Sequence, residues 1–88
     1  MSDIAEILKL RGSKYGLFRD HADVSMQLKC VIAAQLNVRD KVLDNDQLEA
    51  LDMICHKIGR IVNGDPNYAD SWVDIAGYAK LVADRLSS

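Results

Sequence analysis

The strongest constraint on the fold is a tight turn, G-D-P-N at Gly64–Asn67, between two amphipathic segments. Pro66 lacks a backbone N–H and cannot continue the helix before it, so the chain is expected to reverse there. A short connection makes consecutive helices antiparallel neighbours. The stretch Ala50–Ala79 therefore predicts a helical hairpin, and the charged residues on its two arms are the main candidates for a functional site.

Apolar residues recur at three- and four-residue intervals along the chain, and no run alternates with period two, so the pattern predicts helices and no strands. We expect helices over residues 3–10 and 20–37, from Asn45 or Asp46 to Gly64, and from Asp70 or Ser71 to Leu86. The prediction is an all-α fold: a compact four-helix bundle-like domain with a C-terminal antiparallel helical hairpin.

Three local signals refine this prediction. Gly12 is expected just past the end of the first helix, and residues 12–19 are expected to form a loop. Ser71 and Asp74 fit a capping box at the start of the fourth helix. The third helix shows an apolar stripe that we expect to be buried, formed by Leu48, Leu51, Ile54, Ile58, Ile61 and Val62.

Length and composition limit the classes of function. The chain has 88 residues, which predicts one domain over residues 1–88. A formal net charge of -2 argues against nucleic-acid binding, which needs a basic face. No apolar run can span a bilayer and no signal peptide is evident, so we expect no membrane partner. Cys30 and Cys55 are interpreted as reduced core thiols of a cytosolic protein. A small bundle leaves apolar surface to cover, so self-association as a homodimer or higher oligomer is expected.

The expected hairpin brings cations and acids together. If its centre lies near residue 67, positions whose numbers add up to about 134 lie level. Lys57 and Arg60 share a helix face and could hold a phosphate. Acidic and aromatic residues on the other arm could orient that arginine or contact a sugar or base. The candidate ligand-binding residues of the hairpin are Lys57, Arg60, Asp70, Asp74 and Tyr78.

The alternative is that these charges only hold the two helices in register. In that case Arg60 pairs with Asp74 and Glu49 with Arg85 across the interface. Gly77, inside the fourth helix, fits either a close helix crossing or the floor of a pocket, because a helical glycine costs about 1 kcal/mol against alanine. The sequence leaves both alternatives open.

A second basic group precedes the second helix. Arg11, Lys14 and Arg19 make up this group, with Tyr15 among them, and a loop there could close over a phosphate. The competing interpretation is a solvated loop whose aromatic residues pack inward. His21 and His56 are isolated and no metal-ligand spacing occurs, so no metal site is predicted. No catalytic motif is present either, and no catalytic residue and no cofactor are assigned.

Three motifs carry a family resemblance: R-G-S-K-Y-G-L-F at Arg11–Phe18, A-L-D-M-I-C-H-K-I-G-R-I-V-N-G at Ala50–Gly64, and D-S-W-V-D-I-A-G-Y-A at Asp70–Ala79. Together they resemble a family of small uncharacterised proteins from tailed phages and prophages. The resemblance implies a viral accessory protein in the cytoplasm of a bacterial host, and it implies no activity.

D-I-A-G-Y-A-K-L-V, which begins at Asp74, is more distantly similar to the last motif helix of MazG-like all-α nucleotide pyrophosphohydrolases. Those enzymes hold magnesium with carboxylates on two helices, but here Ser71 replaces one of them and Lys57 and Arg60 occupy the preceding helix. We therefore expect a non-enzymatic protein that binds a nucleotide or another phosphate-bearing ligand. A protein-interaction module is the second hypothesis. A magnesium-dependent hydrolase using Asp70, Asp74, Glu49 and Asp52 is the third, and only this third one needs Mg²⁺.

Overall fold

The computed structural model describes residues 3–88, and its regular structure is four α-helices. They are α1 (Asp3–Tyr15), α2 (Phe18–Val38), α3 (Asn45–Asn63) and α4 (Ala69–Ser87). The predicted all-α four-helix fold with a C-terminal antiparallel hairpin is confirmed.

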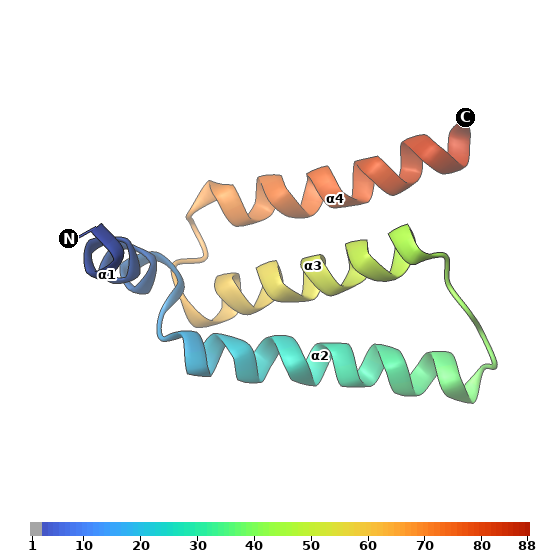
Figure 1. Cartoon of the computed structure of the whole chain (residues 1–88), viewed down its shortest axis with the longest axis horizontal. Helices are drawn as coiled ribbons and strands as arrows, with labels where there is room; N and C mark the ends of the chain where they lie inside the picture. The colour runs from blue at the N-terminus through green and yellow to red at the C-terminus, as the bar shows by residue number, and fades with distance from the viewer. Residues whose placement is uncertain (1–2) are drawn as a thin grey trace.

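The central element of the fold is α3. It packs against α2 on one side and α4 on the other, and among residues 3–88 α2 and α4 do not pack on each other. Figure 1 shows these three helices side by side, with successive helices antiparallel and α1 seen nearly end-on beside the start of α2. The longest dimension is 46 Å. Because α3 has helical neighbours on two sides, its other two faces are available for other contacts.

The first helix is longer than the sequence predicts. It continues through Gly12 to Tyr15, and the chain turns at Gly16, whose φ is 79°. The left-handed region is open to glycine at little cost, so Gly16 ends the helix where Gly12 was expected to. The predicted loop over residues 12–19 is therefore wrong, since α2 already begins at Phe18.

The two turns at this end of the molecule interlock. The Asn63 side chain donates hydrogen bonds to the carbonyl oxygens of Tyr15 (3.0 Å) and Leu17 (3.1 Å). The backbone N–H of Asp65 donates to the carbonyl of Lys14 at 2.7 Å. These bonds fix the end of α1 against the end of α3, and thereby the side chains that those ends carry.

The starts of the last two helices differ in how they are capped. At α3 the Gln47 side chain accepts a hydrogen bond of 2.9 Å from the backbone N–H of Asp44, as in a capping box. The capping box predicted at Ser71 and Asp74 is wrong, because α4 starts earlier, at Ala69. Ser71 is buried inside the helix, and Asp74 binds a lysine of α3.

The apolar core is small. Ala50 and Cys55 are the buried apolar residues among those described. The stripe of α3 that was expected to be buried is open at its ends, with Leu48 42% and Val62 66% exposed. The reason is architectural, since this stripe lies between the contacts to α2 and α4 and no further helix covers it. Cys30 is also exposed, so the expectation of two core thiols holds for Cys55 alone.

Helices α2 and α3 come close together at a glycine that was not singled out in the sequence. A Cβ on Gly59 would lie 2.6 Å from Cδ2 of His21 and 2.9 Å from its carbonyl oxygen. A side chain there would push α2 away from α3. Gly77, by contrast, has nothing within 4 Å of the place a Cβ would take, so it does not mark a close helix crossing.

Candidate anion-binding pocket

A cavity of about 320 Å³ lies where α1, the start of α2 and the end of α3 meet. It is lined by Leu8, Arg11, Gly12, Tyr15, Gly16, Leu17, Phe18, His21 and Arg60. Helix geometry explains the contribution of α1, because Leu8, Arg11 and Tyr15 are spaced to lie on one face. Two arginines and no carboxylate are therefore among the residues that line the pocket.

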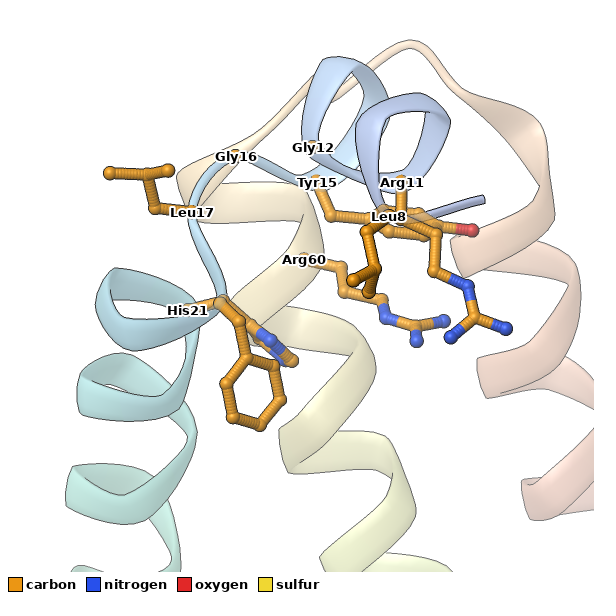
Figure 2. Close-up of a pocket in the computed structure, with 9 residues that line it drawn as sticks. Leu8, Arg11, Gly12, Tyr15, Gly16, Leu17, His21 and Arg60 are labelled. Atoms are coloured by element: carbon orange, nitrogen blue, oxygen red, sulfur yellow. The ribbon is translucent and has the colours of Figure 1, made fainter. Parts of the chain in front are cut away.

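The two arginines come from different helices. Figure 2 shows the side chain of Arg11 descending from α1 and that of Arg60 extending from α3, so that both guanidinium groups end in the same part of the pocket. Neither forms an ion pair with any residue in the range 3–88. Arg85 shows the contrast, because it binds both Asp44 and Asp46. The pocket thus carries positive charge that the chain does not neutralise locally.

Arg60 is held by an aromatic ring instead of by an acid. Its guanidinium carbon lies 4.1 Å from the centre of the Tyr15 ring, which is a cation–π contact. Its Nε is buried and has no hydrogen-bond partner among the described residues. A buried donor without a partner costs free energy, and an anion in the pocket would supply an acceptor.

Two histidine rings, one of which lines the pocket, meet edge to face. The rings of His21 and His56 are 4.4 Å apart, and Nε2 of His21 lies 2.9 Å from the carbonyl oxygen of His56, where a ring N–H donates. Burial, followed by the charges of His21 and Arg60, lowers the pKa of His56 to about 4. Burial also lowers the pKa of His21. Both rings are therefore neutral at pH 7, and the positive charge at this site comes from arginine.

Lys14 and Tyr68 lie behind Tyr15. The rings of Tyr15 and Tyr68 meet edge to face with their centres 5.9 Å apart, and Nζ of Lys14 lies 4.9 Å from the centre of the Tyr68 ring. The nearby Asp70 carboxylate raises the pKa of Tyr68. Three of the predicted residues, Arg11, Tyr15 and Arg60, thus lie together in the pocket. Two others, Lys14 and Asp70, lie next to Tyr68 instead.

Lys57 belongs to a separate interaction. Its Nζ lies 3.0 Å from a carboxylate oxygen of Asp74, and its side chain is only 10% exposed. Arg85 likewise reaches Asp46 near the other end of the hairpin. In both pairs the residue numbers add up to 131, not to the predicted 134. The hairpin register is displaced by three residues, so Lys57 occupies the place opposite Asp74 that was predicted for Arg60.

The rest of the predicted hairpin site lies on the outer side of α4. Gly77 and Tyr78 line a shallow, open depression with Val73, Asp74, Lys80 and Leu81. This depression receives no residue from α1, α2 or α3. The predicted basic pair of α3 is therefore divided in the structure. Arg60 lies with Arg11 and Tyr15 in the pocket, and Lys57 pairs with Asp74.

Six residues that line the pocket were not predicted as site residues from the sequence, namely Leu8, Gly12, Gly16, Leu17, Phe18 and His21. A signal for the first of these was present, since Leu8, Arg11 and Tyr15 follow helical spacing. It was hidden because Gly12 was taken as the end of the helix. No comparable signal marks His21, which reaches the pocket through the close contact at Gly59.

Within residues 3–88 no group of three or more His, Cys, Asp or Glu side chains is placed to hold a metal ion. The carboxylates of the hydrolase hypothesis, Glu49, Asp52, Asp70 and Asp74, are accordingly not gathered in one chain. None of the described helices combines the length and the apolar character needed to cross a bilayer.

The chain was compared with known families, curated proteins and solved structures. Neither the curated proteins nor the solved structures gave a match. A family model described as a domain of unknown function, DUF6378, matches residues 3–86. Because that match covers nearly the whole chain, the protein belongs to the DUF6378 family.

Proposed function

We propose that this protein binds a phosphate-bearing small molecule, with a nucleotide as the first candidate, in the pocket between α1 and α3, and that it does so without catalysis. The observation that carries this proposal is the pairing of Arg11 and Arg60. Two guanidinium groups from different helices line one cavity, and no carboxylate lines it with them.

The charge balance of the pocket favours an anion. Like charges close together repel each other, and the repulsion grows where the protein displaces water. An anion bridging Arg11 and Arg60 would replace this repulsion with two charge-assisted contacts, and a planar guanidinium can hold phosphate through two parallel hydrogen bonds. The free Nε of Arg60 would gain a partner in the same step.

The remainder of the pocket suits an organic group attached to that anion. Leu8, Leu17 and Phe18 provide an apolar wall, and Leu17 and Phe18 are largely exposed in the free protein, at 63% and 74%. A volume of about 320 Å³ is at the small end of ligand sites, which run from roughly 300 to 1,000 Å³. A mononucleotide or a smaller phosphate compound is therefore a better candidate than a dinucleotide.

The proposed site contains fewer residues than the predicted set of ligand-binding residues. Arg11, Tyr15 and Arg60 form the site, and Lys14 is close enough in the chain to act at its rim. Lys57 and Asp74 are assigned to the helix interface, where they satisfy each other. From the resemblance to phage proteins and, more distantly, to MazG-like helical enzymes, we further propose that the protein acts in the cytoplasm of an infected bacterium and there senses or sequesters its ligand.

The test is a calorimetric titration with inorganic pyrophosphate and with a panel of nucleoside mono-, di- and triphosphates. We expect binding by the wild type and at least tenfold weaker binding by Arg60→Gln and by Arg11→Gln. Arg39→Gln is the matched control, because it removes the same charge from an exposed position at the end of α2. Absence of binding by the wild type, or equal loss in Arg39→Gln, would refute the proposal.

A second candidate function, a protein-interaction module, is favoured by a different observation. Sixteen large apolar residues among those described are exposed, on all four helices and in the connections before α2 and α3. Leu8, Leu17 and Phe18 of this set line the arginine pocket, and the other thirteen residues do not.

A further inference from the structure

The apolar stripe of α3 continues onto α4 to form one surface. Leu51 and Ile54 of α3 and Ala79 and Val82 of α4 line a groove of about 310 Å³, together with Leu43, Gln47 and Ala50. Among the residues that the structure describes, none that lines this groove is charged. By helical spacing Leu48, Ile58 and Val62 belong to the same stripe of α3, and Leu86 lies one turn beyond Val82 on α4. We call these residues the α3–α4 apolar face.

The exposed apolar residues of α3 lie on one side of an amphipathic helix. The opposite side of α3 carries Glu49, His56 and Arg60, so the helix is strongly amphipathic. An amphipathic helix normally turns its apolar stripe toward a core. Here no helix among residues 3–88 covers the ends of the stripe, where Leu48 is 42% and Val62 66% exposed, and Leu86 of α4 is 59% exposed.

The dimensions of the chain indicate how much surface is left uncovered. Its accessible surface is 6498 Å², whereas a compact monomer of its mass is expected to expose about 5,200 Å². Its radius of gyration is 15.0 Å, against about 12 Å for a compact domain of its length. The excess surface, about 1,300 Å², exceeds the roughly 800 Å² that each partner buries in a standard interface.

We propose that the α3–α4 apolar face is the interface of a homodimer with twofold symmetry. A second copy of this chain fits the face because an uncharged apolar surface is complementary to itself, as a twofold interface requires. A nucleic acid or an anionic membrane would need basic residues in the groove, and it has none.

The order of residues along α3 sets the register of this dimer. In an antiparallel arrangement about a twofold axis near residue 55, Leu48 of one copy meets Val62 of the other. Leu51 meets Ile58, and the two Ile54 residues lie next to the axis. The stripe from Leu48 to Val62 is about 21 Å long at 1.5 Å per residue, so two α3 helices would pack along most of their length.

The experiment is sedimentation equilibrium of the full chain over a range of concentrations, without ligand. We expect the wild type to sediment at twice the monomer mass of 9.8 kDa. Val62→Glu should raise the dimer dissociation constant at least tenfold, because the dimer would bury two carboxylates. Val62 is exposed in the single chain, so this variant is expected to fold, which circular dichroism would verify.

Val42→Glu is the matched control, since Val42 is 93% exposed in the connection before α3 and lies off the face. It should leave the dimer unchanged. A monomeric wild type at every concentration would overturn the proposal. So would a dimer that Val62→Glu does not weaken, or one that Val42→Glu weakens equally. None of these outcomes bears on the arginine pocket, whose ligand is absent from the measurement.

Discussion

Lys57 and Arg60 are one turn apart on the same helix, yet the structure treats them differently. Lys57 is buried and bound to Asp74 of α4, while Arg60 lies against Tyr15 of α1 and has no acidic partner among the described residues. A cation already paired has little to offer a ligand. The difference shows that the acids around a basic pair, more than the pair itself, decide which residue is available for binding.

The same contrast holds for the two ends of the molecule. At the α3–α4 interface Lys57 and Arg85 meet carboxylates, and the charges fix the hairpin register. At the end where α1 crosses α3, the contacts are made by aromatic rings, glycines and backbone carbonyls. The charges of Arg11 and Arg60 have no acidic partner there among the described residues. The first region accounts for assembly of the fold and the second for the proposed binding. The predictions below separate the two.

The largest effect on stability is expected from Gly59→Ala. The added methyl group would lie 2.6 Å from the ring of His21, so α2 must shift away from α3. We expect destabilisation of about 1–3 kcal/mol, the usual range for an overpacked core. Urea unfolding followed by circular dichroism measures this change. An unaltered or higher midpoint would show that α2 and α3 are not in such close contact.

The next effect separates Lys57 from Arg60. Lys57→Met keeps the apolar stem but leaves Asp74 without its partner. We expect a loss of about 1–2 kcal/mol, below the 3–5 kcal/mol found for fully buried pairs because Asp74 is 45% exposed. Arg60→Gln should cost less, about 0.5–1 kcal/mol, through loss of the contact with Tyr15. Urea unfolding should therefore show Lys57→Met as the less stable variant, while pyrophosphate titration should show Arg60→Gln as the weaker binder. If one variant were both the less stable and the weaker binder, the division of roles would be contradicted.

Stability should also fall in mild acid through His21 and His56, whose rings are in contact. Burial holds the pKa of His56 at about 4, below its ordinary value of 6.5, and lowers that of His21. The unfolded chain therefore takes up protons first as the pH falls. The stabilisation is complete above about pH 6.5 and is lost progressively toward pH 4. The fall in melting temperature between pH 7.0 and 5.5 measures this effect, and it should be smaller in His56→Gln. An equal fall in that variant would exclude His56 as the source.

The smallest effect is expected at the other helical glycine. Gly77→Ala adds a methyl group where nothing lies within 4 Å. Alanine is favoured over glycine in a helix by about 0.8–1.0 kcal/mol, so this variant should melt a few degrees higher than the wild type. A lower melting temperature would mean that something packs closely on Gly77 after all.

The sequence predicts the helices well and the side-chain partners poorly, for a physical reason. Helical periodicity and the Pro66 turn fix the number of helices and the hairpin. A displacement of three residues along an antiparallel helix keeps the same face in contact, because three residues are close to one turn. The apolar pattern therefore does not distinguish Lys57 from Arg60 as the partner of Asp74.

The pocket was hard to predict for a related reason. Gly12 and Gly16 are both compatible with a helix end, and only the packing of Asn63 against the turn selects Gly16. Because the predicted first helix stops at residue 10, Arg11 and Tyr15 fall outside it, and the helix face that they share with Leu8 is not recognised. Arg11, Tyr15 and Arg60 were each candidate residues, but their meeting in one cavity depends on how α1 crosses the end of α3.

The most direct test of the central claim, that Arg60 and Arg11 present an unneutralised anion site, is a titration observed at the arginine side chains. In a ¹⁵N–¹H spectrum the Nε–H signals of Arg60 and Arg11 should shift as pyrophosphate is added. The signal of Arg85, already bound to Asp44 and Asp46, should stay in place. If the Arg60 and Arg11 signals do not move at millimolar pyrophosphate, or if Arg85 moves as far as they do, the account is contradicted.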